Sequence, residues 1–451
     1  MRIRATLVSL AAVFALVAQP VAAQSVLRDA ETEKLLDDMA APLVEAAGLE
    51  PENVDIVLLN DPSLNAFVAG GQAIYIHSGL IDAADTANEV QGVIAHELGH
   101  ITGGHIIRYG EGASKAGKVS ILSMLIGLAA AVAGAGDAAM GVIAAGQQAA
   151  MGKFLAFNRG QESAADLAGA EYLSKAGLSG RGSIDFFKKL QSLERRHGYF
   201  AKSEDTFFRT HPLSRDRIET LQNVYENDPA YDKPADPDIE RRFQRVKAKL
   251  YGYLAKPEDT LVAYPERLQT VPAHYARAYS RHKEALTDKS IAEVDALLAD
   301  SPDDPYFLEL KGQVLLEAGH PEDALPPLRR AVSLTGNEPL IATIFGHALM
   351  ATEDKSHHEE AERVLRAAVA RDRMNPTAWY LLGRIHEARG DTPRARLASA
   401  ETLIMTGQPG AALQNAEAAE AALPAHTPDW LRAQDIAIEA RDQIDRKRKR
   451  D

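Results

Sequence analysis

The chain has 451 residues, a formal net charge of −13 and no cysteine. This length predicts more than one domain. The acidic balance argues against nucleic acid as a general partner. The absence of cysteine excludes a disulfide framework, a thiol nucleophile and a thiolate metal site.

The N-terminal segment has the pattern of a secretory signal. Arg2 and Arg4 give it a positive start, and the apolar run from Leu7 to Val17 is too short to span a bilayer. Small residues end at Ala23, after which we expect cleavage; a retained membrane anchor is the alternative. In a bacterium, the mature protein would then work in the periplasm.

A small sheet is expected after an amphipathic helix over about residues 24–49. Residues 54–59 have the pattern of a buried strand, and residues 65–77 that of a hairpin turning at Gly70-Gly71. An edge strand of such a hairpin could bind a substrate peptide by main-chain hydrogen bonds, although a purely structural hairpin would have the same pattern. The substrate-binding candidates here are Asn65, Ala73, Ile74 and Tyr75.

Residues 96–100 form a His-Glu-x-x-His motif in a helix-like run. Two histidines four residues apart lie on one helix face, so both imidazoles can bind one Zn²⁺. Glu97 suits a different role, because it can take a proton from the attacking water and pass it to a leaving amine. An apolar stripe that includes Val90, Ile94 and Leu98 favours a buried helix over a chance match on a surface helix.

The third zinc ligand has two candidates. The metzincin pattern would need a histidine at the position of Ile106, and His105 is one residue early. On a continuing helix His105 points away from His100, which predicts a structural or partner-facing role. The better candidate is Glu162.

Glu162 and Asp166 lie one turn apart on a predicted helix that is unusually apolar around its carboxylates. Glu162 would complete a site of two histidines and one glutamate, with water in the fourth position. Asp166 could accept the outer N–H of a ligand imidazole. We therefore predict one Zn²⁺ per chain, bound by His96, His100 and Glu162.

Residues 119–150 are apolar and rich in Ala and Gly, with a break at Asp137. The runs are short for a membrane span, and the break predicts a hairpin of two helices. Three alternatives remain open: packed core, a lid over the active site, or a hairpin that contacts a membrane peripherally.

A His-Pro pair at His211 precedes Arg215 and Arg217. The order of these motifs resembles the zinc metallopeptidase family that includes the CAAX prenyl protease, HtpX and the mitochondrial Oma-type proteases. The repeats described below narrow the resemblance to its periplasmic branch. The arginines could anchor the His211 loop on carboxylates near Glu162, or Arg215 could bind the substrate backbone.

The resemblance implies roles for individual residues. It assigns zinc binding to His96, His100 and Glu162, and the general base to Glu97. It places His211 close to the metal, either as an oxyanion stabiliser or as a latch on the open coordination position. It also implies that the hairpin lines the cleft, and that residues 119–150 replace transmembrane helices of integral members.

After a Pro- and Asp-rich boundary at 227–238 and a connecting helix, the chain shows repeats. Gly312, Gly346 and Gly383 recur in helix-like segments with tetratricopeptide-repeat turns. Each unit is a helix pair that cannot bury its apolar face alone, so at least three units should stack.

Together these patterns predict an α+β, mainly α chain: a gluzincin-like metallopeptidase domain with a small edge-strand sheet, followed by an α-solenoid. The expected boundaries are 1–23 for the signal, 24–226 for the peptidase, 227–269 for the linker, and 270–451 for the repeats with a basic tail. The expected function is a zinc endopeptidase acting on misfolded or stalled envelope proteins, whose repeats recruit substrates or outer-membrane assembly machinery. The alternative is a chaperone-like scaffold with a mostly latent protease centre.

Overall fold

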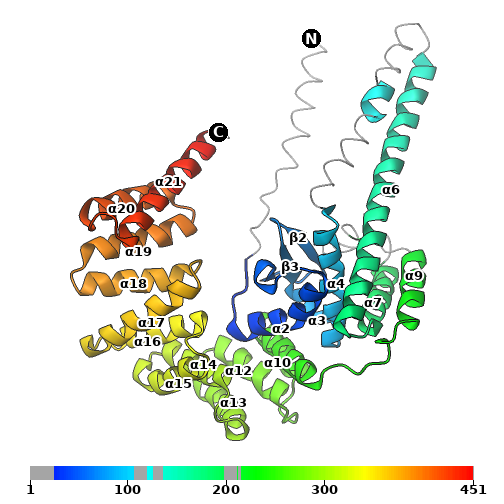
Figure 1. Ribbon diagram of the computed structural model, residues 1–451. Helices are drawn as coiled ribbons and strands as arrows, with labels where there is room; N and C mark the ends of the chain where they lie inside the picture. The colour runs from blue at the N-terminus through cyan, green and yellow to red at the C-terminus, as the bar shows by residue number, and fades with distance from the viewer. Residues whose placement is uncertain (1–24, 106–118, 125–135, 198–210, 212–214, 450–451) are drawn as a thin grey trace, which may run out of the picture. The chain divides into compact units, whose positions relative to one another are not determined.

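The computed structural model describes residues 25–105, 119–124, 136–197, 211 and 215–449 (Figure 1). The chain divides into two compact units. The first, which we call the peptidase unit after the function predicted from its sequence, comprises residues 1–28 and 33–243, and the second, the repeat unit, comprises residues 29–32 and 244–451. The boundary between them falls within one helix, α10 (Pro237–Leu254).

The peptidase unit combines a small sheet with helices, as the sequence predicts. Its strands are β1 (Asp55–Leu59), β2 (Ala66–Ala69) and β3 (Ala73–His77), and its helices are α2 (Ala30–Ala46), η1 (Pro51–Asn53), α3 (Ser78–Ala83), α4 (Ala87–Thr102), α6 (Gly136–Ala176), α7 (Arg181–His197) and α9 (Arg215–Glu226).

The sheet has the strand order β1-β3-β2, in which β3 is parallel to β1 and antiparallel to β2. The central strand is therefore β3, and the expectation that Ala73, Ile74 and Tyr75 lie on an edge is wrong. Both main-chain edges of β3 are already paired, and the Ile74 side chain is fully buried. The edge strands are β1 and β2, of which β2 contacts α4.

The long helix α6 packs against α4 and α9, and α7 packs against α4 (Figure 1). Small residues allow α4 and α6 to approach closely. A Cβ atom at Gly99 would lie 2.6 Å from the carbonyl oxygen of Ala165, and one at Gly169 would lie 3.0 Å from the carbonyl of Ala95. This close crossing brings the middle of α4 against the part of α6 that carries Glu162.

Residues 119–124 lie against α6, because a Cβ atom at Gly146 would overlap the side chain of Ser123. Several large apolar side chains here are exposed: Ile121 by 60%, Leu122 by 57% and Met124 by 51%. For these residues the packed-core alternative is therefore wrong. Residues 125–135 lie outside the described chain, and the lid and membrane alternatives stay untested.

The repeat unit is a succession of antiparallel helix pairs. After α11 (Pro257–Ala263), its helices are α12 (Val271–Lys283), α13 (Thr287–Asp300), α14 (Pro305–Glu317), α15 (Pro321–Leu334), α16 (Pro339–Ala351), η2 (Lys355–His357), α17 (His358–Arg371), α18 (Pro376–Ala388), α19 (Thr392–Met405), α20 (Pro409–Ala422) and α21 (Pro428–Arg448). Consecutive helices from α12 onward pack as pairs, so the predicted solenoid is confirmed.

Two of the repeated glycines explain how the pairs α14/α15 and α16/α17 close. A Cβ atom at Gly312 would meet the side chain of Leu328 at 2.3 Å, and one at Gly346 would meet Leu365 at 2.6 Å. Only glycine lets the two helices of a pair approach this closely without a shift. The longer spacing before Gly383 is explained by the extra turn η2, which lies between α16 and α17.

The predicted fold class is confirmed: the chain is mainly helical, with one three-stranded sheet in its described part. Within the residues that the structure describes, no helix is both long enough and apolar enough to cross a membrane.

Candidate metal centre

Helix α4 positions the His-Glu-x-x-His motif. Its first turn is capped by Thr86, whose side chain accepts a hydrogen bond from the main-chain N–H of Glu89. The Glu89 carboxylate reaches back to the N–H of Asp85, which closes a variant of the capping box. One helical turn separates His96 from His100, so both rings lie on the face that meets α6.

Four side chains converge where this face of α4 meets α6: His96, His100, Glu162 and His211. We call them the metal-ligand cluster. One potential ligand atom from each lies within 4.8 Å of all the others, and the four side chains are buried or nearly so.

The spacing fits a tetrahedral ion. The Nε2 atom of His96 lies 3.1 Å from Nε2 of His100, 3.2 Å from Nδ1 of His211 and 3.5 Å from Oε2 of Glu162. Oε1 of Glu162 lies 3.4 Å from Nε2 of His100. Ligand bonds of about 2.0–2.1 Å to a tetrahedral centre give edges of about 3.3–3.4 Å. The donor set and its dimensions therefore fit one zinc-sized cation.

The outer nitrogen of His96 has a carboxylate partner. Its Nδ1 atom lies 2.9 Å from Oδ1 of Asp166. Asp166 is in turn held by the buried guanidinium of Arg217, which donates from Nε at 2.6 Å and from Nη2 at 2.8 Å. Arg217 Nη1 also lies 3.1 Å from Oε2 of Glu162. This chain of contacts fixes the orientation of the His96 ring.

The outer nitrogen of His100 has a different partner, His105. The expectation that His105 points away from His100 is wrong, because the helix ends at Thr102 and the chain turns through Gly103 and Gly104. Gly104 has a φ of 62°, in the left-handed region that favours glycine. The turn places Nδ1 of His105 2.9 Å from Nδ1 of His100.

Gly103 makes room for this contact. A Cβ atom there would lie 2.4 Å from Nε2 of His105. When His100 binds a cation through Nε2, its Nδ1 keeps the proton and donates to Nδ1 of His105.

Glu97 is buried on the same helix, and neither of its carboxylate oxygens makes a hydrogen bond within the described residues. Its Oε1 atom lies 3.4 Å from Nε2 of His211. A buried carboxylate without hydrogen-bonded partners is costly in a purely structural role. It suits a site where water or substrate supplies the missing hydrogen bond.

The pKa values follow from this crowding. Burial raises the pKa of Glu162, but hydrogen bonds with His100, His211 and His96 outweigh burial and hold it far below its usual range. Burial also lowers the pKa of His100, which favours the neutral, ligating form. For His96, the Asp166 and Glu162 carboxylates overcome burial and raise the pKa to about 10. A cation that binds His96 must therefore displace a proton.

The other predicted residues lie elsewhere. His77 is buried against Ser63 with its Nδ1 2.8 Å from the hydroxyl oxygen, which supports the structural interpretation. Asn65 is buried before β2, and Arg215 is exposed at the start of α9. The cation that reaches the carboxylates is Arg217, two residues further on, because it lies on the inward face of α9.

Comparison with known proteins supports this arrangement. Residues 27–225 match the model of peptidase family M48, and residues 275–339 and 351–412 match a tetratricopeptide-repeat model. The Beta-barrel assembly-enhancing protease of Yersinia pestis is 25% identical over 363 residues, which are 78% of this chain and 71% of that protein.

The protein of the same name from Escherichia coli (strain K12) is 23% identical over 391 residues, covering 85% of this chain and 77% of that protein. Metalloprotease LoiP of the same strain is 29% identical over 198 residues, covering 43% of this chain and 71% of that protein.

The fold and the cluster thus define a metallopeptidase joined to a helical repeat array. More specifically, the match over residues 27–225 is to peptidase family M48, and the matches over the segment that follows are to tetratricopeptide repeats.

Proposed function

We propose that this protein is a zinc-dependent endopeptidase of the bacterial periplasm that cleaves misfolded or stalled outer-membrane proteins. The observation that carries the catalytic part is the convergence of four ligand atoms beside the buried Glu97. The outer-membrane part rests on the relatives named Beta-barrel assembly-enhancing protease. The periplasmic part rests on the signal-like residues 1–23, which lie outside the described chain.

Each residue of the cluster has a proposed task. His96, His100 and Glu162 hold the ion, while Asp166 and His105 orient the two imidazoles. A bound zinc ion would polarise the scissile carbonyl and make water nucleophilic at neutral pH. Glu97 accepts the proton of the attacking water and delivers it to the leaving amine. The edge strand β2, next to α4, is the proposed place where a substrate backbone adds to the sheet.

His211 has two proposed roles, one of which slows cleavage and the other of which speeds it. In the latch version its Nδ1 takes the fourth position of the tetrahedron and keeps water and substrate out. Its distances of 3.2 Å from both His96 and Glu162 favour this version. In the oxyanion version the ring moves back and donates to the charge that develops on the carbonyl oxygen.

The catalytic proposal is tested with Glu97→Gln. The variant should lose cleavage of unfolded casein by about 10²–10⁴-fold, with unchanged metal content by atomic emission. Glu171→Gln, an exposed change on α6, is the matched control and should cleave normally. Undiminished cleavage by Glu97→Gln would reject Glu97 as the base.

His211→Ala separates the two roles of His211. A latch predicts faster cleavage of casein and of the protein itself, whereas an oxyanion stabiliser predicts slower cleavage. Unchanged rates would place His211 outside the reaction in either role.

A second candidate function is a chaperone-like scaffold for outer-membrane protein assembly, with a protease centre that stays latent. The closed four-ligand geometry with His211 favours latency. If Glu97→Gln preserved outer-membrane assembly in cells while abolishing cleavage, the assembly role would belong to the scaffold.

A further inference from the structure

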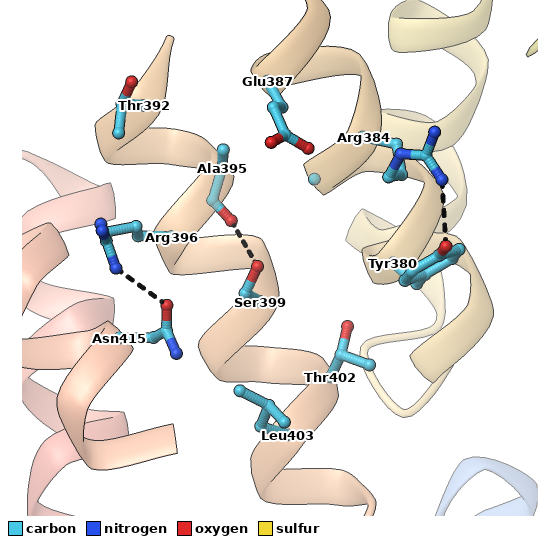
Figure 2. Close-up of a pocket in the computed structure, with 11 residues that line it drawn as sticks. Tyr380, Arg384, Glu387, Thr392, Ala395, Arg396, Ser399, Thr402, Leu403 and Asn415 are labelled. Carbon is cyan, nitrogen blue, oxygen red and sulfur yellow. Dashed lines mark hydrogen bonds between the residues drawn. The ribbon is translucent and has the colours of Figure 1, made fainter. Parts of the chain in front are cut away.

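A groove in the repeat unit has features of a ligand site. It encloses about 500 Å³ between α18, α19 and α20 (Figure 2). This volume is in the range of about 300–1,000 Å³ that is usual for binding pockets. Its walls combine one aromatic ring, two guanidinium groups and a row of hydroxyl and amide groups.

The two arginines are unlike their neighbours. Arg384 donates to the hydroxyl oxygen of Tyr380 at 3.1 Å, and Arg396 donates to Oδ1 of Asn415 at 3.4 Å, as Figure 2 shows. Neither has a carboxylate within ion-pair distance in the described chain. By contrast, the nearby Arg389 forms an ion pair with Glu362. Both groove arginines therefore keep N–H groups available for an added carboxylate.

The hydroxyl groups of α19 offer hydrogen-bond acceptors beside the donors of the two arginines. Ser399 donates to the carbonyl of Ala395 at 2.9 Å, and Thr402 donates to that of Ala398 at 3.0 Å. Because these protons are already used within the helix, the oxygens face a ligand as acceptors. Acceptors at successive turns suit the main-chain N–H groups of an extended peptide.

The remaining wall residues suit a side chain of the same peptide. Tyr380 is 51% exposed at the groove, and Leu403 adds an aliphatic contact. An exposed aromatic ring beside a guanidinium is a common anchor in peptide recognition. Glu387 is the one acidic residue of this lining, so the two arginines leave the groove net positive in a chain of net charge −13.

We propose that this groove binds an extended polypeptide segment that carries acidic side chains next to apolar ones. Arg384 and Arg396 bind the carboxylates, Ser399 and Thr402 accept main-chain N–H groups, and Tyr380 packs on an apolar side chain. This inference rests on the proposed recruiting role of the repeats and specifies where in the array it occurs and for which chemistry.

The test uses the full chain with Glu97→Gln, so that the probe stays uncut. The probe is a short, fluorescein-labelled and C-terminally amidated peptide of alternating Asp and Leu, and its matched partner has Asn in place of every Asp. By fluorescence anisotropy the Asp peptide should bind about tenfold more tightly than the Asn peptide. Added salt should remove this difference.

The double variant Arg384→Gln, Arg396→Gln should bind the Asp peptide about as weakly as the Asn peptide. Arg389→Gln, which removes an arginine that already has a carboxylate partner, is the control and should leave binding unchanged. The comparison of the two peptides on the unaltered groove is independent of how the variants fold.

Equal affinity for both peptides, no detectable binding, or equal loss in the control would overturn the proposal. The proposed peptidase function is read separately, from casein cleavage by the chain with Glu97 intact. Cleavage without any dependence on the groove would leave that function standing and reject the groove alone.

Discussion

Each unit buries a cluster of charged side chains, and the two clusters differ in how their charges are balanced. In the peptidase unit, ligand atoms of three imidazoles and Glu162 converge on one point, and the buried guanidinium of Arg217 contacts Glu162 and Asp166 from outside that point. In the repeat unit, the cations lie inside the cluster.

The second cluster, which we call the ion cluster, consists of Asp29, Glu31, Arg245, Lys249 and Tyr275. Lys249 Nζ lies 2.5 Å from Asp29 and 3.2 Å from Glu31, and the Tyr275 hydroxyl donates to Glu31 at 2.7 Å. Arg245 pairs with Glu31 and with Asp304. Burial lowers the pKa of Lys249, but Asp29 and its other neighbours raise it well above its usual value.

The two clusters show that burial of ionisable groups does not by itself mark a functional site. A cluster that contains its own cations satisfies itself and holds segments of the chain together. A cluster whose ligand atoms converge on one point, as in the peptidase unit, holds a proton there until a cation from solution displaces it. This distinction can be tested by removing one member from either cluster.

The largest effect on stability is expected from Lys249→Met. It leaves the half-buried carboxylate of Asp29 and the buried carboxylate of Glu31 without their ammonium partner, which should cost about 3–5 kcal/mol in the free energy of unfolding of the repeat unit. Urea unfolding followed by circular dichroism measures the loss. Zinc affinity should not change. Lys311→Met, which removes an exposed ion pair with Asp295, is the control and should cost under about 1 kcal/mol.

Glu162→Ala should weaken zinc binding and leave the stability of the repeat unit unchanged, the reverse of Lys249→Met. Zinc affinity should fall by more than about 100-fold, beyond the effect of losing an outer partner of a ligand, while the repeat unit unfolds as before. Competition with a chromophoric chelator gives the affinity, and Glu171→Ala on the same helix serves as the control. Unchanged affinity would remove Glu162 from the ligand set.

His105→Ala sharpens the comparison within the metal-ligand cluster. The variant removes the acceptor for Nδ1–H of His100 and should lower zinc affinity by about 10–100-fold. His105→Asn presents an acceptor at the position of Nδ1 and should restore much of the affinity. If the His105→Ala and His105→Asn variants bound zinc equally well, His105 would be a packing residue and not a positioning residue.

The smallest expected effect is a pH dependence in the repeat unit. Glu309 is buried, its Oε2 makes no hydrogen bond in the described chain, and burial raises its pKa to about 8 from 4.5. Between these values the folded state holds a proton that the unfolded state has released. Stability therefore falls as the pH rises through this window.

Glu309→Gln removes this titration. The variant should be more stable than the parent by on the order of 2 kcal/mol at high pH, and the gain should vanish in acid. Urea unfolding at a series of pH values measures it, with the exposed Glu322→Gln as the control. A pH-independent difference would contradict the assignment to Glu309.

The sequence by itself determined what depends on local spacing. Helix periodicity placed two histidines on one face of α4, and recurring glycines with turn residues predicted the helix pairs of the repeat unit. The hairpin over β2 and β3 followed from alternation around Gly70-Gly71. These features are readable because each involves residues within one or two turns, or one hairpin, of each other.

Only the tertiary structure decided what depends on contacts between distant segments. The close crossing at Gly99 and Gly169 brings Glu162 to the histidines, and the turn at Gly103-Gly104 returns His105 to His100. The inward face of α9 selects Arg217 over Arg215, and the parallel pairing with β1 makes β3 central. Helix and strand periods fix which face a residue occupies, but the packing partner of that face is set by the rest of the fold.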